Sequence, residues 1–232
     1  QTGWYSAASR IVGVSMLPSS LISLAFFPAL SSTLNNLQKF QKSWNFQMEA
    51  MIFLAFPIVV GGMTLAPQII NFVYGSGFAP SVLALQISIV SVIFVLLYSP
   101  FNQAIILFNQ QRKVFWMSMM GAFLNVALNL ILIPKYSLYG AAISTVFTYF
   151  LLFCLVLRYA IRLTPVKLIN SSLLLGFFGS IIASIIMYFV ISRPQVYRLD
   201  IYYLIFIGAA AYLIGFLAFK KIAGQLKFAK IS

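Results

Sequence analysis

Long apolar stretches separated by short polar segments dominate the chain. Seven of them are about 20 residues long or longer, the length that an α-helix needs to cross a bilayer. None shows the alternation with period two of membrane β-strands, and backbone groups in lipid must be satisfied within the segment, which favours helices. We place the predicted spans at residues 11–33, 48–72, 82–108, 114–134, 138–157, 168–191 and 201–219. The sequence therefore predicts an all-α polytopic membrane protein with seven transmembrane helices.

Between the first two predicted spans, the apolar residues of segment 34–44 recur at helical spacing beside Lys39 and Lys42. This pattern predicts a short helix that lies on the surface of the inner leaflet. An ordinary loop is the alternative.

Lysine and arginine residues lie mainly on one side of the seven-span arrangement. Counted in alternate loops and tails, eleven fall on one side, and four fall on the other: Arg10, Lys135, Arg193 and Arg198. Such an excess marks the cytoplasmic side of a membrane protein. We therefore expect the C-terminus to be cytoplasmic and the N-terminus to lie outside.

Composition narrows the possible chemistry. Apolar residues make up 62% of the 232 residues and charged residues 7%, whereas a soluble domain carries about 25% charge. The chain has no histidine, one cysteine, and two acidic residues, Glu49 and Asp200. A histidine base, a histidine-bound metal or a catalytic triad is thus ruled out, and a catalytic carboxylate pair is not expected. We expect no enzyme, no cofactor and no metal. The net charge of +13 lies in loops, so we expect no nucleic-acid partner either.

Prolines interrupt the first three predicted spans. The five interior prolines are Pro18, Pro28, Pro57, Pro67 and Pro100. A proline inside a helix removes a hydrogen bond and kinks the helix, and interrupted helices mark moving parts in secondary transporters. We therefore predict gating kinks at these positions. The alternative is that they reflect only the general abundance of proline in membrane helices.

The fourth and fifth predicted spans carry residues that suit close helix packing. Asn125 and Asn129 lie four residues apart on one helix face, and Gly140 opens the next span. Small residues let membrane helices approach each other, and an asparagine donates across the interface. We predict that these three residues pack helices together and do not bind a ligand.

The same region carries a family resemblance. Residues 124–149 read LNVALNLILIPKYSLYGAAISTVFTY, with two asparagines four apart, an Ile-Pro helix end, and Gly-Ala-Ala opening the next span. This stretch resembles the hallmark segment of polysaccharide flippases in the multidrug, oligosaccharidyl-lipid and polysaccharide exporter superfamily. Residues 3–10, GWYSAASR, and 26–32, FFPALSS, are similar to the span that follows the first half of these proteins.

The resemblance implies a protein of 14 spans in two bundles, of which this chain looks like the second half. Residues 1–163 would supply five spans of the second bundle, and residues 164–232 an accessory helix pair and a cytoplasmic tail. The implied partners are the missing N-terminal half, membrane lipids and a lipid-linked oligosaccharide. Family members flip undecaprenyl-diphosphate-linked sugars from the inner to the outer leaflet of the prokaryotic cytoplasmic (inner) membrane, by alternating access of two bundles.

Four residues are candidates for contact with such a substrate. The resemblance points to Arg10, because the related lipid II flippases carry an arginine that faces the central cavity at a similar place. An arginine near a span end is alternatively an interfacial anchor that extends toward water. Gln86, Asn102 and Gln103 lie within the third predicted span and could bind sugar hydroxyls, or could tie helices together.

Other functions remain open at this stage. A cation-coupled multidrug exporter of the same superfamily needs a carboxylate in mid-membrane. Glu49, at the cytoplasmic start of the second predicted span, either has that role or pairs with Lys42 or the helix N-terminus, and Asp200 suits an N-cap. A polysaccharide polymerase or ligase usually bears a large outer loop, and the longest predicted outer gap has about ten residues. A channel is the last alternative, although no pore motif is visible.

Overall fold

The computed structural model describes residues 2–167 and 170–228. Within these ranges the chain is helical and has no strand, which confirms the all-α prediction. The elements are α1 (Thr2–Ser31), α2 (Leu37–Thr64), α3 (Ala66–Tyr74), the 3-10 turn η1 (Ser76–Phe78), α4 (Ser81–Ile89), α5 (Ser91–Leu107), α6 (Gln111–Tyr136), α7 (Leu138–Leu163), α8 (Ser171–Ile191), α9 (Pro194–Tyr197) and α10 (Ile201–Phe228). By length and composition, seven helical segments in the described residues are able to cross a membrane, as predicted.

Two spans begin earlier than the hydropathy pattern predicts. Helix α1 begins at Thr2 instead of residue 11, and α2 begins at Leu37 instead of residue 48. The prediction of a separate surface helix at 34–44 is therefore wrong. Asn36 caps α2 by accepting a hydrogen bond from the Lys39 backbone N–H at 3.1 Å. One side of the early turns of α2 packs into the protein, where Phe40 and Trp44 are fully buried.

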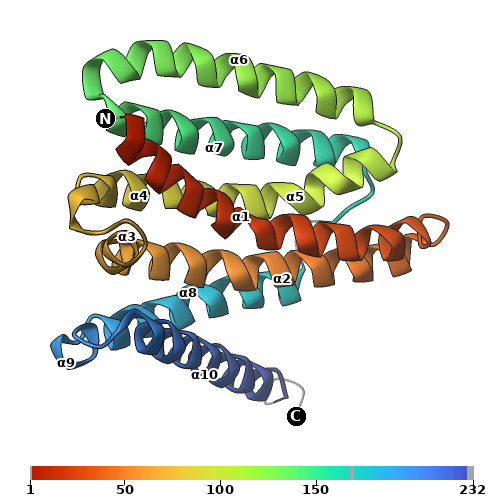
Figure 1. The fold of residues 1–232 in the computed structure, drawn as a ribbon. Coiled ribbons are helices and arrows are strands. Elements are labelled where there is room, and N and C mark those ends of the chain that lie inside the picture. The colour runs from red at the N-terminus through yellow and green to blue at the C-terminus, as the bar shows by residue number, and fades with distance from the viewer. Residues whose placement is uncertain (1, 168–169, 229–232) are drawn as a thin grey trace.

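Four of the five prolines predicted to kink helices lie inside a helix, and one lies at a helix start. Pro18 and Pro28 lie inside α1, and Pro57 and Pro100 lie inside α2 and α5. Figure 1 shows α1 changing direction near its middle. Pro67, in contrast, lies in the first turn of α3, where its missing N–H costs nothing. It marks the start of a new helix, which corrects its assignment as a kink within one continuous span.

Two of the predicted spans are each built from two helices. A break at Leu65 separates α2 from α3, and a break at Val90 separates α4 from α5. Figure 1 shows α6, α7, α5, α2, α8 and α10 following one another from top to bottom, with α1 crossing in front of α4, α5 and α2. The loops after α1, α5 and α7 and the end of α10 lie at one end of the molecule (Figure 1). These are the segments in which the sequence places the excess of basic residues.

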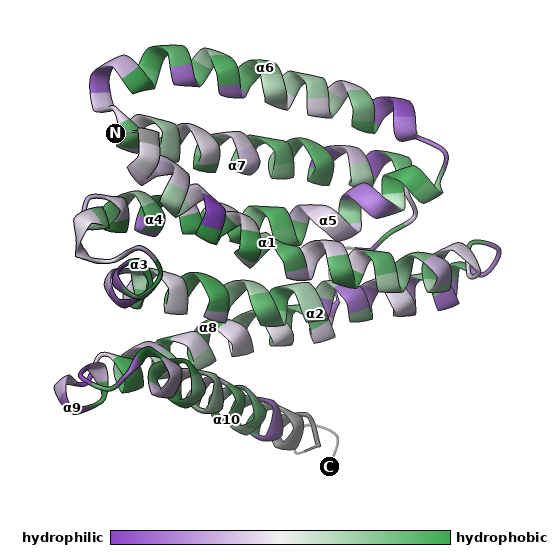
Figure 2. Ribbon diagram, in the orientation of Figure 1, coloured by the Kyte–Doolittle hydropathy of each residue, from purple (hydrophilic) through white to green (hydrophobic). Residues whose placement is uncertain are grey.

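The outer surface is apolar along the helices. Phe123 and Leu130 of α6 are 79% and 73% exposed, and Figure 2 shows that hydrophobic residues occur along the length of the helices. Many other large apolar side chains are exposed along the helices, and such a surface suits hydrocarbon and not water. Together with the seven spanning helices, this surface is that of a multi-pass membrane protein. The single cysteine, Cys154, is exposed on α7 and does not fill a core position.

Helices α8 and α10 pack against each other and against α2. Gly179 of α8 allows the Phe219 ring to approach so closely that an added Cβ would lie 2.8 Å from it. The hydroxyl of Tyr212 in α10 donates to the Phe53 carbonyl of α2 at 2.7 Å. Helix α7 ends at Leu163, so the predicted boundary between residues 163 and 164 falls at a helix end. The division into a bundle and an accessory pair stays a prediction.

Candidate functional site

Arg10 lies in the third turn of α1, eight residues after the helix begins, or about 12 Å along its axis. Ala7, Ala8 and Val12 are buried on the packed side of this helix, whereas Arg10 is exposed on the opposite side. Among the described residues, no hydrogen bond or ion pair of the Arg10 side chain is present. The guanidinium therefore stands free on the outer face of a spanning helix.

The start of α1 is held firmly on its packed side. The indole Nε1 of Trp4 donates to the Gly77 carbonyl of η1 at 3.2 Å, and the hydroxyls of Tyr5 and Thr145 of α7 lie 3.2 Å apart. These bonds fix the rotation of α1 about its axis, and so fix the direction in which Arg10 points. The sequence alone did not reveal these partners.

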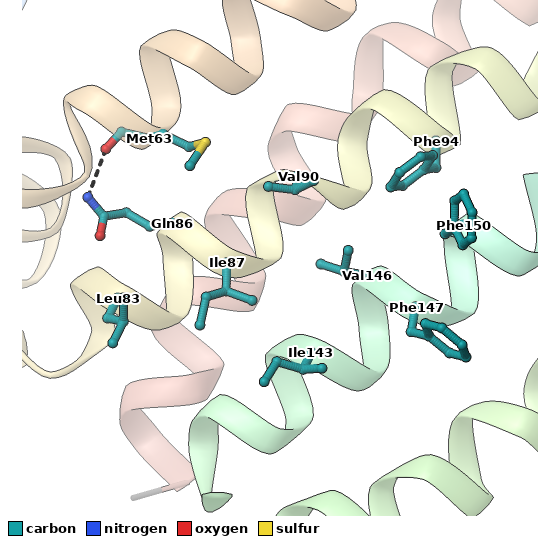
Figure 3. Close-up of a pocket in the computed structure, with 10 residues that line it drawn as sticks. All are labelled: Met63, Leu83, Gln86, Ile87, Val90, Phe94, Ile143, Val146, Phe147 and Phe150. Carbon is teal, nitrogen blue, oxygen red and sulfur yellow. Dashed lines mark hydrogen bonds between the residues drawn. The ribbon is translucent and has the colours of Figure 1, made fainter.

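Gln86 lies elsewhere, in a large apolar pocket between α4, α5 and α7 (Figure 3). The pocket has a volume of about 680 Å³ and is lined by Met63, Leu83, Gln86, Ile87, Val90, Phe94, Ile143, Val146, Phe147 and Phe150. The Gln86 amide donates to the Met63 carbonyl at 3.0 Å, as Figure 3 shows. None of the lining residues belongs to α1, so this pocket and Arg10 are separate.

Gln103 is buried and ties three helices together. Its Nε2 donates to the Ser23 carbonyl of α1 at 2.8 Å, and its Oε1 accepts from Nε2 of Gln47 in α2 at 2.6 Å. Asn102 accepts from the Tyr98 hydroxyl at 3.0 Å. Ser23 lies 13 residues after Arg10, or about 20 Å along the helix. The four predicted substrate contacts therefore occupy three separate places.

Two residues of α2 that the sequence patterns did not single out complete this polar contact. Gln47 is fully buried, and its Oε1 has no partner among the described residues. The Trp44 indole donates to the carbonyl of Pro100, the proline that interrupts α5, at 3.1 Å. A signal was present: Gln47 is an amide one turn beyond a tryptophan, at the entrance to an apolar run.

The predicted packing residues lie between α6 and α7. Asn125 Nδ2 donates to the Thr148 hydroxyl at 3.1 Å, and Asn129 Nδ2 donates to Asn125 Oδ1 at 3.0 Å. An added Cβ at Gly140 would overlap the Leu132 carbonyl oxygen. These contacts join the two helices directly.

The two acidic residues lie apart from each other and from the predicted substrate contacts. Glu49 accepts a hydrogen bond from the Ser172 hydroxyl, in the first turn of α8, at 2.6 Å. Asp200 immediately precedes α10, and its carbonyl accepts from the Leu204 N–H. In the part of the chain that the structure describes, no group of three or more metal-ligating side chains occurs.

Comparisons with known proteins agree with the resemblance seen in the sequence. A family model described as "Polysaccharide biosynthesis protein" matches residues 1–83. A protein of Haloferax volcanii, "Probable low-salt glycan biosynthesis flippase Agl15", is 25% identical over 149 residues, which is 63% of this chain and 32% of that protein. The chain thus spans about a third of the length of this curated relative.

A solved structure shares the fold. "Lipid II flippase MurJ, inward closed conformation" superposes with a TM-score of 0.73 at 20% identity, over 97% of this chain and 48% of that one. The seven-span helical arrangement is therefore that of about half of such a protein. The chain is therefore similar in part of its sequence to a polysaccharide biosynthesis family and to a glycan biosynthesis flippase, and it has the all-helical fold of about half of a lipid II flippase.

Proposed function

We propose that the protein flips an undecaprenyl-diphosphate-linked oligosaccharide from the inner to the outer leaflet for polysaccharide biosynthesis, without catalysing a covalent step. The observation that carries this proposal is Arg10, a free guanidinium on the exposed face of a spanning helix. Burying an arginine in a membrane costs at least about 2.5–3.5 kcal/mol on insertion scales, so it is retained for a partner. A diphosphate matches the planar fork of a guanidinium.

The face around Arg10 is suited to line a cavity. Gly3, Ser6 and Gly13 are exposed on the same side of α1. The side chains on the N-terminal side of the guanidinium are therefore small, whereas Val14 and Leu17 follow it on the same face. A bulky headgroup can fit beside these small side chains, whereas leucines at the same positions would occupy that space. In the proposed arrangement this face meets the N-terminal half. The two halves then open alternately to the inner and the outer side of the membrane around the substrate.

The electrical energy of the membrane favours this direction of transport. A diphosphate that carries about two negative charges moves away from a negative cytoplasm, and each charge gains about 2.3 kcal/mol per 100 mV. The potential could therefore supply nearly 5 kcal/mol without ATP. This scheme places the N-terminus outside and the C-terminus in the cytoplasm of a prokaryotic cytoplasmic membrane.

The interior prolines serve as gating positions in this scheme. Pro18 and Pro28 of α1, Pro57 of α2 and Pro100 of α5 lie in the helices that share the polar contact around Gln103. Each removes one helical hydrogen bond, so the helix bends there at low cost. Residues 164–232 form an accessory pair beside the moving bundle.

Substitution of Arg10 in the full-length protein tests the proposal. Loss of a charge-assisted, bidentate contact should lower flipping by at least about tenfold in Arg10→Ala, and Arg10→Lys should recover it only in part. Flipping is measured in proteoliposomes with a fluorescent lipid-diphosphate oligosaccharide, at equal protein abundance. Arg198→Ala is the matched control, because Arg198 is exposed next to the short helix α9. Wild-type flipping in Arg10→Ala would reduce Arg10 to an interfacial anchor.

A further inference from the structure

A polar pocket lies where α1, α2 and α8 meet, at the end of the molecule that carries the basic loops. Its volume is about 460 Å³, within the range of about 300–1,000 Å³ that is typical of small-molecule sites. The lining residues are Phe26, Lys42, Ser43, Asn45, Phe46, Glu49, Asn170 and Ser172. The proposed flipping step uses none of them.

The pocket is lined by one positively charged residue, Lys42, and one negatively charged residue, Glu49, which do not pair with each other. Lys42 and Glu49 are seven residues apart, so they share one face of α2 and lie about 10 Å apart along the helix. Among the described residues no ion pair joins them; Glu49 Oε1 instead accepts from the Ser172 hydroxyl. Asn45 lies between them, and its Oδ1 accepts from Gln41 Nε2 at 2.7 Å, which leaves its amide N–H groups to donate. The net charge of the pocket is zero, but its two ends are opposite.

The length of α2 places the pocket across the boundary between headgroups and hydrocarbon. Helix α2 has 28 residues and is about 42 Å long, whereas the hydrocarbon core is about 30 Å thick. With this excess at the end that carries Lys39 and Lys42, Lys42 lies outside the core and Glu49 lies just inside its edge. Phe26 and Phe46 form the apolar edge of the pocket with ring centroids 5.6 Å apart, and Phe46 is 64% exposed. A ligand in the pocket has acyl chains on one side and polar groups on the other.

We infer that this pocket binds a phospholipid headgroup that carries both a phosphate and a primary ammonium, as in phosphatidylethanolamine. The phosphate accepts hydrogen bonds from Lys42 and the Asn45 amide. The ammonium donates to Glu49, whose carboxylate has acceptor sites beyond the one that Ser172 uses. A purely anionic headgroup leaves Glu49 without a cation, and a trimethylammonium headgroup has no N–H to donate. The inference requires only that the helices cross a membrane, so it does not depend on transport.

Lipid competition on the wild-type protein gives the first test. Detergent-solubilised full-length protein is mixed with phosphatidylethanolamine, phosphatidylcholine or phosphatidylglycerol of identical acyl chains, and the bound lipid is counted by native mass spectrometry. We expect phosphatidylethanolamine to be retained at least about tenfold more tightly than the other two, the effect of one charge-assisted contact. Equal retention of all three lipids would overturn the inference. Soluble phosphoethanolamine at the same concentration should not compete, and full competition by it would show that the site takes a free metabolite instead.

Two variants with a matched control give the second test. Lys42→Gln should lose the preference for phosphatidylethanolamine, and Glu49→Gln, which leaves the pocket with a net positive charge, should prefer phosphatidylglycerol. Lys39→Gln removes the same charge one turn earlier on α2, at an exposed position outside the pocket, and should behave as wild type. Identical lipid retention in Lys42→Gln and Lys39→Gln would contradict the assignment.

Discussion

Replacing Gly140 with alanine tests how closely α6 and α7 must approach. Only Ser137, with a φ of 53°, separates the two helices, so they turn back on each other at once. A Cβ at position 140 would overlap the Leu132 carbonyl oxygen and lie 2.9 Å from the Ile133 nitrogen. Both are backbone atoms that cannot rotate aside. The helices themselves must therefore separate at this end.

The expected cost follows from two opposing terms. Forcing extra volume into a packed contact costs about 1–3 kcal/mol, and separation also lengthens the 3.1 Å bond from Asn125 to Thr148. Alanine gains about 1 kcal/mol over glycine in helix propensity. We therefore expect Gly140→Ala to lose about 1–2 kcal/mol. In Gly61→Ala the new Cβ would lie at an ordinary 3.7 Å from Met187 Cε, so this control should be neutral or stabilised by up to about 1 kcal/mol.

The measurement is the free energy of unfolding of the purified protein, followed by circular dichroism as SDS is added to mixed micelles. The two glycine variants carry the same chemical change in two spanning helices, so their difference isolates the backbone overlap. If Gly140→Ala unfolds at the same SDS fraction as Gly61→Ala, the close approach of α6 and α7 has no energetic consequence and the reasoning fails.

Three further changes have defined outcomes. Gln103→Leu should destabilise by about 1–3 kcal/mol because it strands the buried amide of Gln47, and the double variant with Gln47→Leu should recover part of this in a double-mutant cycle. Asn109 has a φ of 58°, so Asn109→Ala should cost about 1 kcal/mol in the same unfolding assay, whereas Asn109→Gly should not. Pro100→Ala should raise the melting temperature by restoring a helical hydrogen bond in α5, yet slow flipping in proteoliposomes if that kink is a gate.

Hydropathy predicts the number of spanning helices well, because each must supply about 20 apolar residues on its own. It predicts their ends poorly. The apolar run of α2 begins near residue 48, but the helix begins at Leu37, because Asn36 caps it and Trp44 packs into the core. A hydropathy window scores neither the capping hydrogen bond nor the packing of a side chain into the core. Hydropathy does not predict the helix breaks at Leu65 and Val90 for the same reason.

The roles of the polar residues depend on how the helices are rotated against each other. Gln103 has the same chemistry whether it faces a sugar or another amide, and only the rotation of α5 against α2 brings it to Gln47. Gln86 likewise turns to the Met63 carbonyl in an apolar pocket. Asn125 differs, because a second asparagine one turn later already indicated a shared helix face.

Helix α1 is held at two points on its packed side and bends between them. Near its start, Trp4 and Tyr5 bond to η1 and α7, and toward its other end the Ser23 carbonyl accepts from an amide of α5. Pro18 lies between these anchors. A helix fixed at two points and missing one hydrogen bond between them can change its bend with little loss of contact. Arg10 lies on the exposed face before Pro18, so it stays with the first anchor when the far end of α1 moves. A change of bend thus alters the exposed face, where we propose that the diphosphate binds, while the packed face keeps its neighbours.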